Sequence, residues 1–227
     1  MTKLVILAGG EGSRFFPFTS IIPKCLVPVA GKPCVRRIIE DAISQGFKDI
    51  VLCINEKDRA HYAHEFRDLD IQFSVTEVPM DTAGEVLQAQ HYLDGAPFIV
   101  RYGDDLTEVS YQALVDFHNI CDSDVTLVAT NQMPLPVGII EVAPEATLKV
   151  TRFIEKPALN RLAWAGIAVF NHNMLAHFHV DIARNTLPAI LSDPHSEVYV
   201  FRTTSEWYDV GNIEHWRKVD QYFKEKE

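Results

Sequence analysis

The chain has few cysteines and no long apolar run. Its four cysteines are Cys25, Cys34, Cys53 and Cys121. They are widely spaced and form no Cys-x-x-Cys pair, which favours a reducing compartment over a disulfide-stabilised protein. The N-terminal apolar run, residues 4–8, is far too short for a signal peptide or a membrane span. We therefore expect a cytoplasmic protein without a membrane segment.

Basic residues are also in the minority. The sequence has 21 Lys and Arg against 31 Asp and Glu, which gives a net charge of −10. An acidic surface repels phosphodiester backbones and anionic lipids, so nonspecific binding to nucleic acid or to a membrane is disfavoured. Any anionic ligand must be held by a local cluster of cationic side chains. The composition is compatible with a homo-oligomer.

Internal repeats, low-complexity tracts and long Pro/Gly/Ser linkers are absent from the sequence. With 47% apolar and 23% charged residues, the 227 residues can bury a substantial core. We therefore expect a single domain over residues 1–227, in which residues 1–130 and 131–227 form two portions with different patterns.

In residues 1–130, short apolar runs alternate with amphipathic segments. Strands are predicted at residues 3–7, 49–54, 71–75, 98–102 and 125–129. Helices are predicted from Cys34 to a stop at Gly46 and at residues 58–66, 82–92 and 111–120, where Thr82 and Glu85 have the spacing of a capping box. Repeated strand–helix units predict an α/β fold with a Rossmann-like, mixed but mainly parallel central sheet and flanking helices.

The pattern changes after residue 130. Strands are predicted at residues 137–142, 148–154, 163–170 and 198–202, with two short helical stretches between them and a closing amphipathic helix at 213–223. This smaller, β-rich portion is expected to face the substrate.

A glycine-rich loop, Leu-Ala-Gly-Gly-Glu-Gly-Ser-Arg at residues 7–14, follows the first strand. Its glycines let the backbone approach a ligand closely, and Ser13, Arg14 and Lys24 supply hydrogen-bond donors and positive charge. It is not a Rossmann fingerprint, because Phe15 stands where the third glycine is needed, and no Walker A sequence is present. The pattern predicts phosphate binding; the alternative is a tight turn with both cations solvated.

Two further motifs follow predicted strands. Residues 79–84 precede a helix, and Gly103, Asp104 and Asp105 end the strand at 98–102. Ligands of open α/β sheets gather beyond the carboxyl ends of the strands, so these motifs and the glycine loop are expected to face one crevice. Adjacent carboxylates suit Mg²⁺, although an Asp after Gly is more often a turn residue.

The ordered set of motifs resembles the signature of sugar-1-phosphate nucleotidyltransferases across nearly the whole chain. It comprises the loop at 7–14, Pro17-x-Thr19, Pro23-Lys24-x-Leu26-x-Pro28-Val29, Thr82-Ala83-Gly84, Gly103-Asp104, Gly138, Glu155-Lys156-Pro157, Ala165-Gly166-Ile167 and Trp207-x-Asp209-Val210-Gly211. The resemblance implies a nucleotide-binding α/β sheet with a sugar-binding portion at 131–227. It also implies the reaction: NTP and sugar 1-phosphate give an NDP-sugar and pyrophosphate with Mg²⁺.

The resemblance also implies roles for individual residues. Arg14 would grip the β- and γ-phosphates, Lys24 would lie near the α-phosphate and Lys156 would contact the sugar phosphate; these three are the catalytic candidates. Asp104 and Asp209 would hold Mg²⁺. The implied nucleotide-binding residues are Leu7, Ala8, Gly9, Gly10, Gly12, Ser13, Arg14, Lys24, Thr82, Gly84, Gly103 and Asp104, and the implied sugar-binding residues are Gly138, Glu155, Lys156 and Gly166.

Some interpretations stay open at this point. Thr82 could read the edge of the base or simply cap the helix. Asp81 stands where many members have glycine, and it could accept hydrogen bonds from guanine or cap the same helix. The role of Asp105 is undefined. Two alternative functions are a non-catalytic, NDP-sugar-binding regulator of the same fold and a nucleotidyltransferase that acts on a non-sugar phosphate such as phosphocholine.

Overall fold

A seven-stranded sheet forms the centre of the molecule. The computed structural model describes residues 2–131, 138–143, 149–155 and 161–226. The sheet strands are β1 (Lys3–Leu7), β4 (Ile50–Asn55), β5 (Gln72–Thr76), β6 (Phe98–Tyr102), β8 (Val125–Thr130), β11 (Ala163–Phe170) and β12 (Val198–Arg202). Their order is β12-β8-β11-β6-β1-β4-β5, and β11 pairs antiparallel with both of its neighbours while the other pairs are parallel. The predicted mixed, mainly parallel α/β fold is confirmed.

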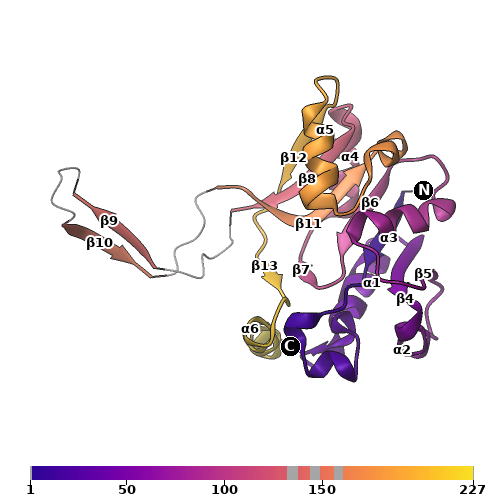
Figure 1. The fold of residues 1–227 in the computed structure, drawn as a ribbon, viewed down its shortest axis with the longest axis horizontal. Helices are drawn as coiled ribbons and strands as arrows, with labels where there is room; N and C mark the ends of the chain where they lie inside the picture. Colours follow the sequence, from indigo (N-terminus) through magenta and orange to yellow (C-terminus); the bar gives the residue numbers. More distant parts are fainter. Residues whose placement is uncertain (1, 132–137, 144–148, 156–160, 227) are drawn as a thin grey trace.

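Helices cover both faces of this sheet (Figure 1). They are α1 (Cys34–Ser44), α2 (Arg59–Glu65), α3 (Thr82–Gln88), α4 (Tyr111–Ile120), α5 (Leu187–Ser192) and α6 (Ile213–Lys226). Side chains alternate between the two faces along a strand, so Leu4 and Ile6 of β1 belong to one buried cluster and Val5 and Leu7 to the other. The first cluster includes side chains of α1, α2, α4 and α6, and the second includes side chains of α3 and α5.

The predicted elements of residues 1–130 are present with small shifts at their ends. Helix α1 begins at Cys34, buries an apolar stripe and is followed by Gly46 at φ +90°, a conformation that glycine adopts readily. The helix predicted at 82–92 is α3 followed by a 3₁₀ turn, Ala89–Tyr92. Three more 3₁₀ turns, Ser13–Phe15, Phe18–Ser20 and Lys24–Leu26, shape the chain between β1 and the short strands β2 (Pro28–Val29) and β3 (Lys32–Pro33).

The strands after residue 130 separate into two groups. Strands β11 and β12 complete the central sheet, so both portions of the chain build it. Strands β9 (Ile139–Val142) and β10 (Val150–Ile154) form an antiparallel hairpin that projects from the body of the molecule (Figure 1). The division into a nucleotide-binding and a sugar-binding portion stays a prediction.

A second, two-stranded ladder brings the C-terminal region back to the centre. Strand β13 (Trp207–Asp209) pairs antiparallel with β7 (Asp105–Thr107), which places Asp209 opposite Asp105. Helix α6 follows and packs beside β2, where Nε1 of Trp216 donates to the Pro28 carbonyl at 2.7 Å. None of the helices in the described part of the chain combines the length and apolar character that a bilayer crossing requires.

Buried Arg101 of β6 holds the β7 strand of this ladder through hydrogen bonds to its carbonyl groups. It is 1% exposed, and its guanidinium donates to the Tyr111 hydroxyl and to the carbonyls of Asp105 at 3.2 Å and Thr107 at 3.1 Å. Buried carbonyls need such donors, because an unsatisfied polar group in the interior is costly.

Replacement of Arg101 by Met is therefore expected to destabilise the protein by about 3 kcal/mol or more. The substitution leaves the carbonyls of Asp105 and Thr107 and the Tyr111 hydroxyl without this donor. Urea-induced unfolding measures this loss. The matched control is Arg67→Met on the exposed surface after α2, which should change the unfolding free energy by less than about 0.5 kcal/mol. Equal effects of the two substitutions would contradict the supporting role of Arg101.

Candidate active site

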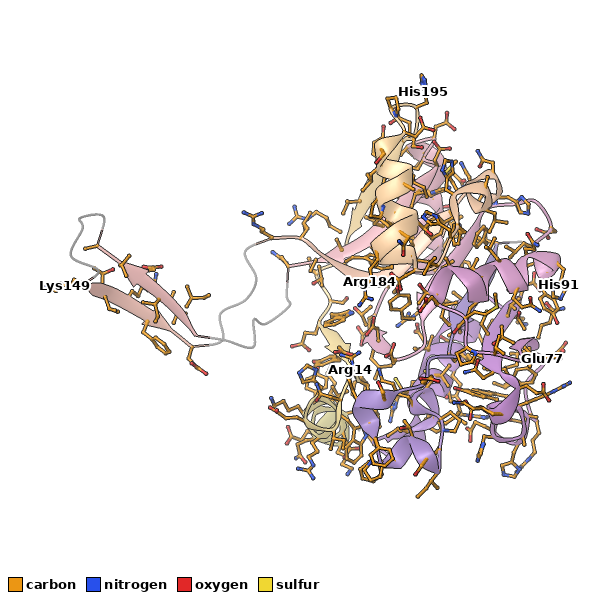
Figure 2. The ribbon with its side chains drawn as sticks, in the orientation of Figure 1. Arg14, Glu77, His91, Lys149, Arg184 and His195 are labelled. Atoms are coloured by element: carbon orange, nitrogen blue, oxygen red, sulfur yellow. The ribbon has the colours of Figure 1, made fainter. Side chains whose placement is uncertain are left out.

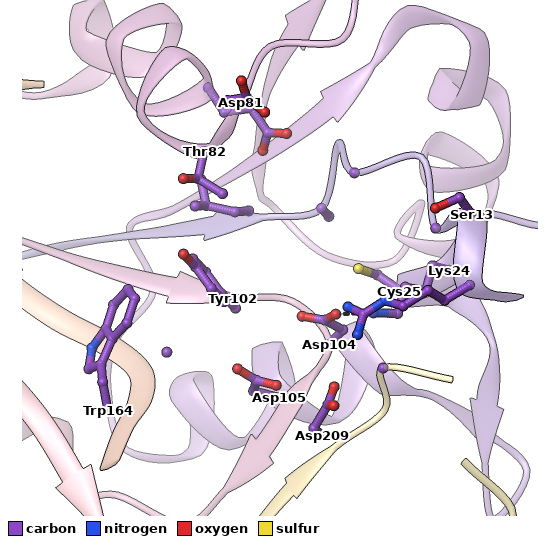
Figure 3. Close-up of a pocket in the computed structure, with 18 of the residues that line it drawn as sticks. Ser13, Lys24, Cys25, Asp81, Thr82, Tyr102, Asp104, Asp105, Trp164 and Asp209 are labelled. Carbon is purple, nitrogen blue, oxygen red and sulfur yellow. Dashed lines mark hydrogen bonds and ion pairs between the residues drawn. The ribbon is translucent and has the colours of Figure 1, made fainter. Parts of the chain in front are cut away.

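A cavity of about 520 Å³ lies at the carboxyl ends of β1 and β6. The glycine loop follows β1, residues 104 and 105 follow β6, and the segment before α3 closes another side (Figure 3). Its lining residues are Leu7, Ala8, Gly10, Gly12, Ser13, Arg14, Lys24, Cys25, Met80, Asp81, Thr82, Glu85, Tyr102, Asp104, Asp105, Trp164, Gly166, Trp207, Asp209 and Gly211. The three strand-end motifs therefore share one crevice, as expected for an open α/β sheet.

The glycine loop is fixed from behind by packing and hydrogen bonds. Gly12 has φ +62°, and a Cβ there would lie 2.8 Å from Cγ2 of Thr19 and 2.9 Å from Cβ of Lys24. The Thr19 hydroxyl donates to the Gly12 carbonyl at 3.2 Å, and the Asn55 amide donates to the Gly9 carbonyl. These contacts hold the backbone open toward the cavity, where it can approach a ligand closely.

Lys24 is the buried cation of the site. It is 9% exposed, and its ammonium forms an ion pair with the Asp104 carboxylate. Burial alone would lower the pKa of Lys24, but the attraction of Asp104, supplemented by Asp209, outweighs burial and raises the pKa. Lys24 is therefore positively charged at neutral pH.

Arg14 is the exposed cation of the site. Its side chain lines the cavity and makes no ion pair with any residue in the described ranges. Five guanidinium N–H donors are thus available to an anionic ligand at this end of the cavity.

Three carboxyl groups converge near Lys24. The β7–β13 ladder brings Asp209 beside Asp105, and the Val210 amide donates to the Asp104 carbonyl at 3.0 Å. Figure 3 shows the side chains of Asp104, Asp105 and Asp209 facing the same part of the cavity. Burial, reinforced by the charges of Asp104 and Asp209, raises the pKa of Asp105 well above its usual range. Asp105 therefore accepts a proton readily, whereas Asp104 and Asp209 are about one-quarter exposed at the cavity surface.

The donor set at this position fits a hard divalent cation. Asp104 and Asp209 offer carboxylate oxygens from two different strand ends. Among the described residues, no group of three or more His, Cys, Asp and Glu side chains is arranged to hold a metal by itself. Mg²⁺ is usually bound by one or two carboxylates and takes its other ligands from water and substrate phosphates, so two carboxylates are sufficient for it.

Three of the predicted nucleotide-binding glycines pack behind the cavity wall instead of lining it. A Cβ would lie 2.5 Å from Oε1 of Glu85 at Gly9, 2.9 Å from Cβ of Met80 at Gly84 and 2.8 Å from the Leu7 carbonyl oxygen at Gly103. The missing side chains thus allow close packing of the segments that carry the lining residues. A direct contact with a nucleotide stays a prediction for all three.

The predicted sugar-binding residues are spread over two places. Gly166 lines the cavity at φ +72°, and a Cβ there would lie 2.4 Å from Oδ2 of Asp105. Gly138 and Glu155 lie at the ends of the β9–β10 hairpin, which projects from the body, and they do not line the cavity. Lys156 lies outside the described residues. Sugar contacts of these residues stay predictions.

The capping-box interpretation of Thr82 and Glu85 is wrong. Asp81 occupies the N-cap position of α3, and its side chain makes no capping hydrogen bond. The Thr82 hydroxyl donates to Asp181 at 3.1 Å and accepts from the Ile182 amide at 2.8 Å. Thr82 thus joins α3 to the segment before α5.

Sequence reasoning missed Glu85 and Tyr102 as cavity residues. Glu85 is 3% exposed, and its Oε2 has no hydrogen-bond partner among the described residues. Burial raises the pKa of Glu85 to about 8, against the lowering effect of the Gly9 amide. The Tyr102 ring lies 5.3 Å from the Trp164 ring and forms an aromatic wall with it. The sequence offered one signal for Glu85, because a glutamate beside the apolar residues Ala83 and Val86 of a helix is unusual on a buried face.

Comparisons with known proteins agree with this architecture. Residues 3–226 match the family model described as Nucleotidyl transferase. Mannose-1-phosphate guanyltransferases of Hypocrea jecorina and Gibberella zeae are 33% and 34% identical to the chain over 224 residues, which are 92% of this chain and 60% of each relative. The chain thus spans about 60% of the length of these curated relatives.

Two solved structures share the fold at low sequence identity. HddC from Yersinia pseudotuberculosis, complexed with GMP-PN, has a TM-score of 0.75 and 24% identity, with 99% of this chain and 100% of that chain covered. A putative glucose-1-phosphate thymidylyltransferase from Bacillus anthracis has a TM-score of 0.75 and 16% identity, with 99% and 96% covered.

The proton on Glu85 makes stability depend on pH. The folded state holds this proton up to about pH 8, whereas the unfolded chain releases it near the ordinary pKa of 4.5. Stability is therefore highest below the unfolded pKa and falls, by up to about 1.4 kcal/mol per pH unit, as the pH rises toward the folded pKa. Glu85→Gln should remove this component, and urea unfolding between about pH 5 and pH 8 measures it.

The control for this measurement is Glu77→Gln, which removes an exposed carboxylate near α3. It should leave the pH dependence of the wild type unchanged. Parallel stability curves for the wild type and Glu85→Gln would show that Glu85 is ionised in the folded protein.

Proposed function

The chain belongs to the nucleotidyl transferase family, and from this premise we propose that it transfers a nucleotidyl group from an NTP to a sugar 1-phosphate. An oxygen of the sugar phosphate attacks the α-phosphorus and forms the new P–O bond. The bond from the α-phosphorus to the oxygen bridging to the β-phosphate breaks, and pyrophosphate leaves. The products are an NDP-sugar and pyrophosphate.

The observation that carries this proposal is the charge arrangement of the cavity. Lys24 and Arg14 supply two cations beside an open glycine loop, in a protein with a net charge of −10. Both reactants are anions that repel one another, so positioning and electrostatic stabilisation must provide most of the catalysis. Buried Lys24 is suited to the α-phosphate, where charge builds up. Arg14, which makes no ion pair with a described residue, is suited to the departing β- and γ-phosphates.

The reaction needs no nucleophile or general base from the protein. A phosphate monoester has its second pKa at about 6, so the attacking oxygen is already ionised near neutral pH. This agrees with a cavity in which the two carboxyl groups with raised pKa, Glu85 and Asp105, are buried.

Asp104 and Asp209 would hold Mg²⁺, since both carboxylates are partly exposed and face the same part of the cavity. When bound, Mg²⁺ would neutralise charge on the phosphates. Asp105 lies beside them in the buried part of the wall, where burial raises the pKa of its carboxyl group. Lys24 remains paired with Asp104 and so is kept at the same point.

The substrates to test first are suggested by the names of the relatives and by the residues around Gly166 in the cavity. Two relatives are named for guanyl transfer to mannose 1-phosphate, which makes GTP and a hexose 1-phosphate the first substrates to assay. The sugar is expected beside Gly166, Tyr102 and Trp164, because the aromatic side chains there offer apolar surface for packing against a sugar ring. We further propose action in the cytoplasm, which the four free thiols support.

Pyrophosphate release should identify the reaction. The purified chain is incubated with each of GTP, UTP, dTTP, CTP and ATP against mannose 1-phosphate, glucose 1-phosphate and phosphocholine, with Mg²⁺. We expect release only when an NTP and a sugar 1-phosphate are both present. If phosphocholine is the one acceptor that supports pyrophosphate release, the substrate is a non-sugar phosphate. If the chain binds NDP-sugars but releases no pyrophosphate, a regulatory function is favoured.

Asp104→Asn should lower Mg²⁺-dependent pyrophosphate release by about 100-fold or more, because the substitution removes a charged oxygen ligand. The circular dichroism spectrum should be unchanged. The control is Asp116→Asn, which alters an exposed carboxylate on α4 and should retain full activity. Full activity of Asp104→Asn would exclude Asp104 as a metal ligand.

A further inference from the structure

One wall of the cavity, formed by Asp81, Thr82 and Glu85, is rich in hydrogen-bond acceptors. Figure 3 shows Asp81 and Thr82 across the cavity from Lys24 and Ser13. The phosphate-binding cations are thus at one end, and this wall is at the other. A nucleotide with its phosphates at Lys24 would reach this wall if its base lay across the cavity.

Asp81 provides two uncommitted acceptors in this wall. Its side chain is exposed and lines the cavity. Although Asp81 is the N-cap residue of α3, its carboxylate makes no capping hydrogen bond and no ion pair with any described residue. A carboxylate accepts hydrogen bonds through both oxygens and can take two adjacent donors at once.

Neither of the two neighbouring side chains adds a second exposed carboxylate to this wall. The Thr82 hydroxyl already donates to Asp181 and accepts from Ile182. Glu85 is buried, its Oε2 lacks a partner among the described residues, and burial keeps it neutral up to about pH 8 by raising its pKa. Asp81 is therefore the exposed carboxylate of this wall.

Among the common bases, guanine has the edge that complements such an acceptor. Its N1–H and N2–H₂ groups are adjacent donors. Uracil and thymine place carbonyl oxygens on both sides of one N–H, and adenine and cytosine each have a ring nitrogen acceptor beside their amino group. Each of those four edges would set a lone pair against the Asp81 carboxylate.

We propose that Asp81 is the residue that selects guanine, by accepting hydrogen bonds from N1–H and N2–H₂ of the base. This inference rests on the proposed function, since it places an NTP in the cavity with its phosphates at the glycine loop. Asp81 is a specificity residue: it distinguishes among nucleotides and takes no part in the transfer of the nucleotidyl group.

Comparison of GTP with ITP isolates this interaction, because inosine lacks only the N2 amino group of guanosine. Binding to the full chain is measured by calorimetry with Mg²⁺ and without sugar phosphate. We expect the wild type to bind GTP about 10- to 100-fold more tightly than ITP, the range that a hydrogen bond to a charged group provides. Asp81→Ala should reduce this ratio to about 1.

Two further variants serve as controls. Glu77→Gln removes the same negative charge from an exposed position that does not line the cavity, and Figure 2 shows Glu77 at the surface and well separated from Arg14. It should keep the GTP/ITP ratio of the wild type. Asp81→Asn retains one acceptor oxygen and should give an intermediate GTP/ITP ratio. This variant tests whether both carboxylate oxygens accept hydrogen bonds from the base.

A wild type that binds GTP and ITP equally, or a GTP/ITP ratio that survives in Asp81→Ala, would overturn the inference. If such a protein still released pyrophosphate from an NTP and a sugar 1-phosphate, the proposed function would stand without it. If none of the five common NTPs bound, both the proposed function and this inference would be overturned.

Discussion

The buried ion pair between Lys24 and Asp104 is the constraint around which the cavity is arranged. It joins the segment that follows the glycine loop to the end of β6. Burial of either charge alone would cost several kcal/mol, so each residue requires the other until a ligand compensates. An ion pair of this kind adds little net stability, but it fixes where a cation and a carboxylate meet. The remaining acidic residues are arranged about that point.

Protonation resolves an apparent conflict in this site. Five carboxyl groups line a cavity that is proposed to receive two anionic substrates: Asp81, Glu85, Asp104, Asp105 and Asp209. Burial raises the pKa of Glu85 and of Asp105, so these two favour the neutral form. Of the remaining three, Asp104 is paired with Lys24 and Asp81 lies at the far end. The effective negative charge near the phosphates is much smaller than the residue count suggests.

The regular part of the fold could be predicted because its signals are local. The apolar run of β1 and the helical spacing of α1 each extend over at least one full period of the element. The β7–β13 ladder could not be predicted, since each strand has only three residues and the partners are about a hundred positions apart in the chain. Long-range pairing of such short strands leaves no periodic pattern. The strand end itself nominated Asp104, whereas Asp209 could be nominated as its partner only through family resemblance.

Glu85 shows a different limit of prediction. Its spacing from Thr82 is that of a capping box, but the start of α3 is set by Asp81, whose extended φ and ψ place it before the helix. Glu85 then points inward and packs against Gly9, a contact between residues far apart in sequence. Local spacing describes which hydrogen bonds are available, whereas tertiary packing decides which of them form.

The contact between Glu85 and Gly9 also links the two ends of the proposed nucleotide site. A Cβ at position 9 would lie 2.5 Å from Oε1 of Glu85, so the glycine loop and α3 are packed without spare room. This contact couples the glycine loop to α3, because close-packed interiors transmit displacement. A base that fits poorly against Asp81 would displace the phosphates from Lys24, and discrimination would then be measured in the rate of transfer as well as in binding.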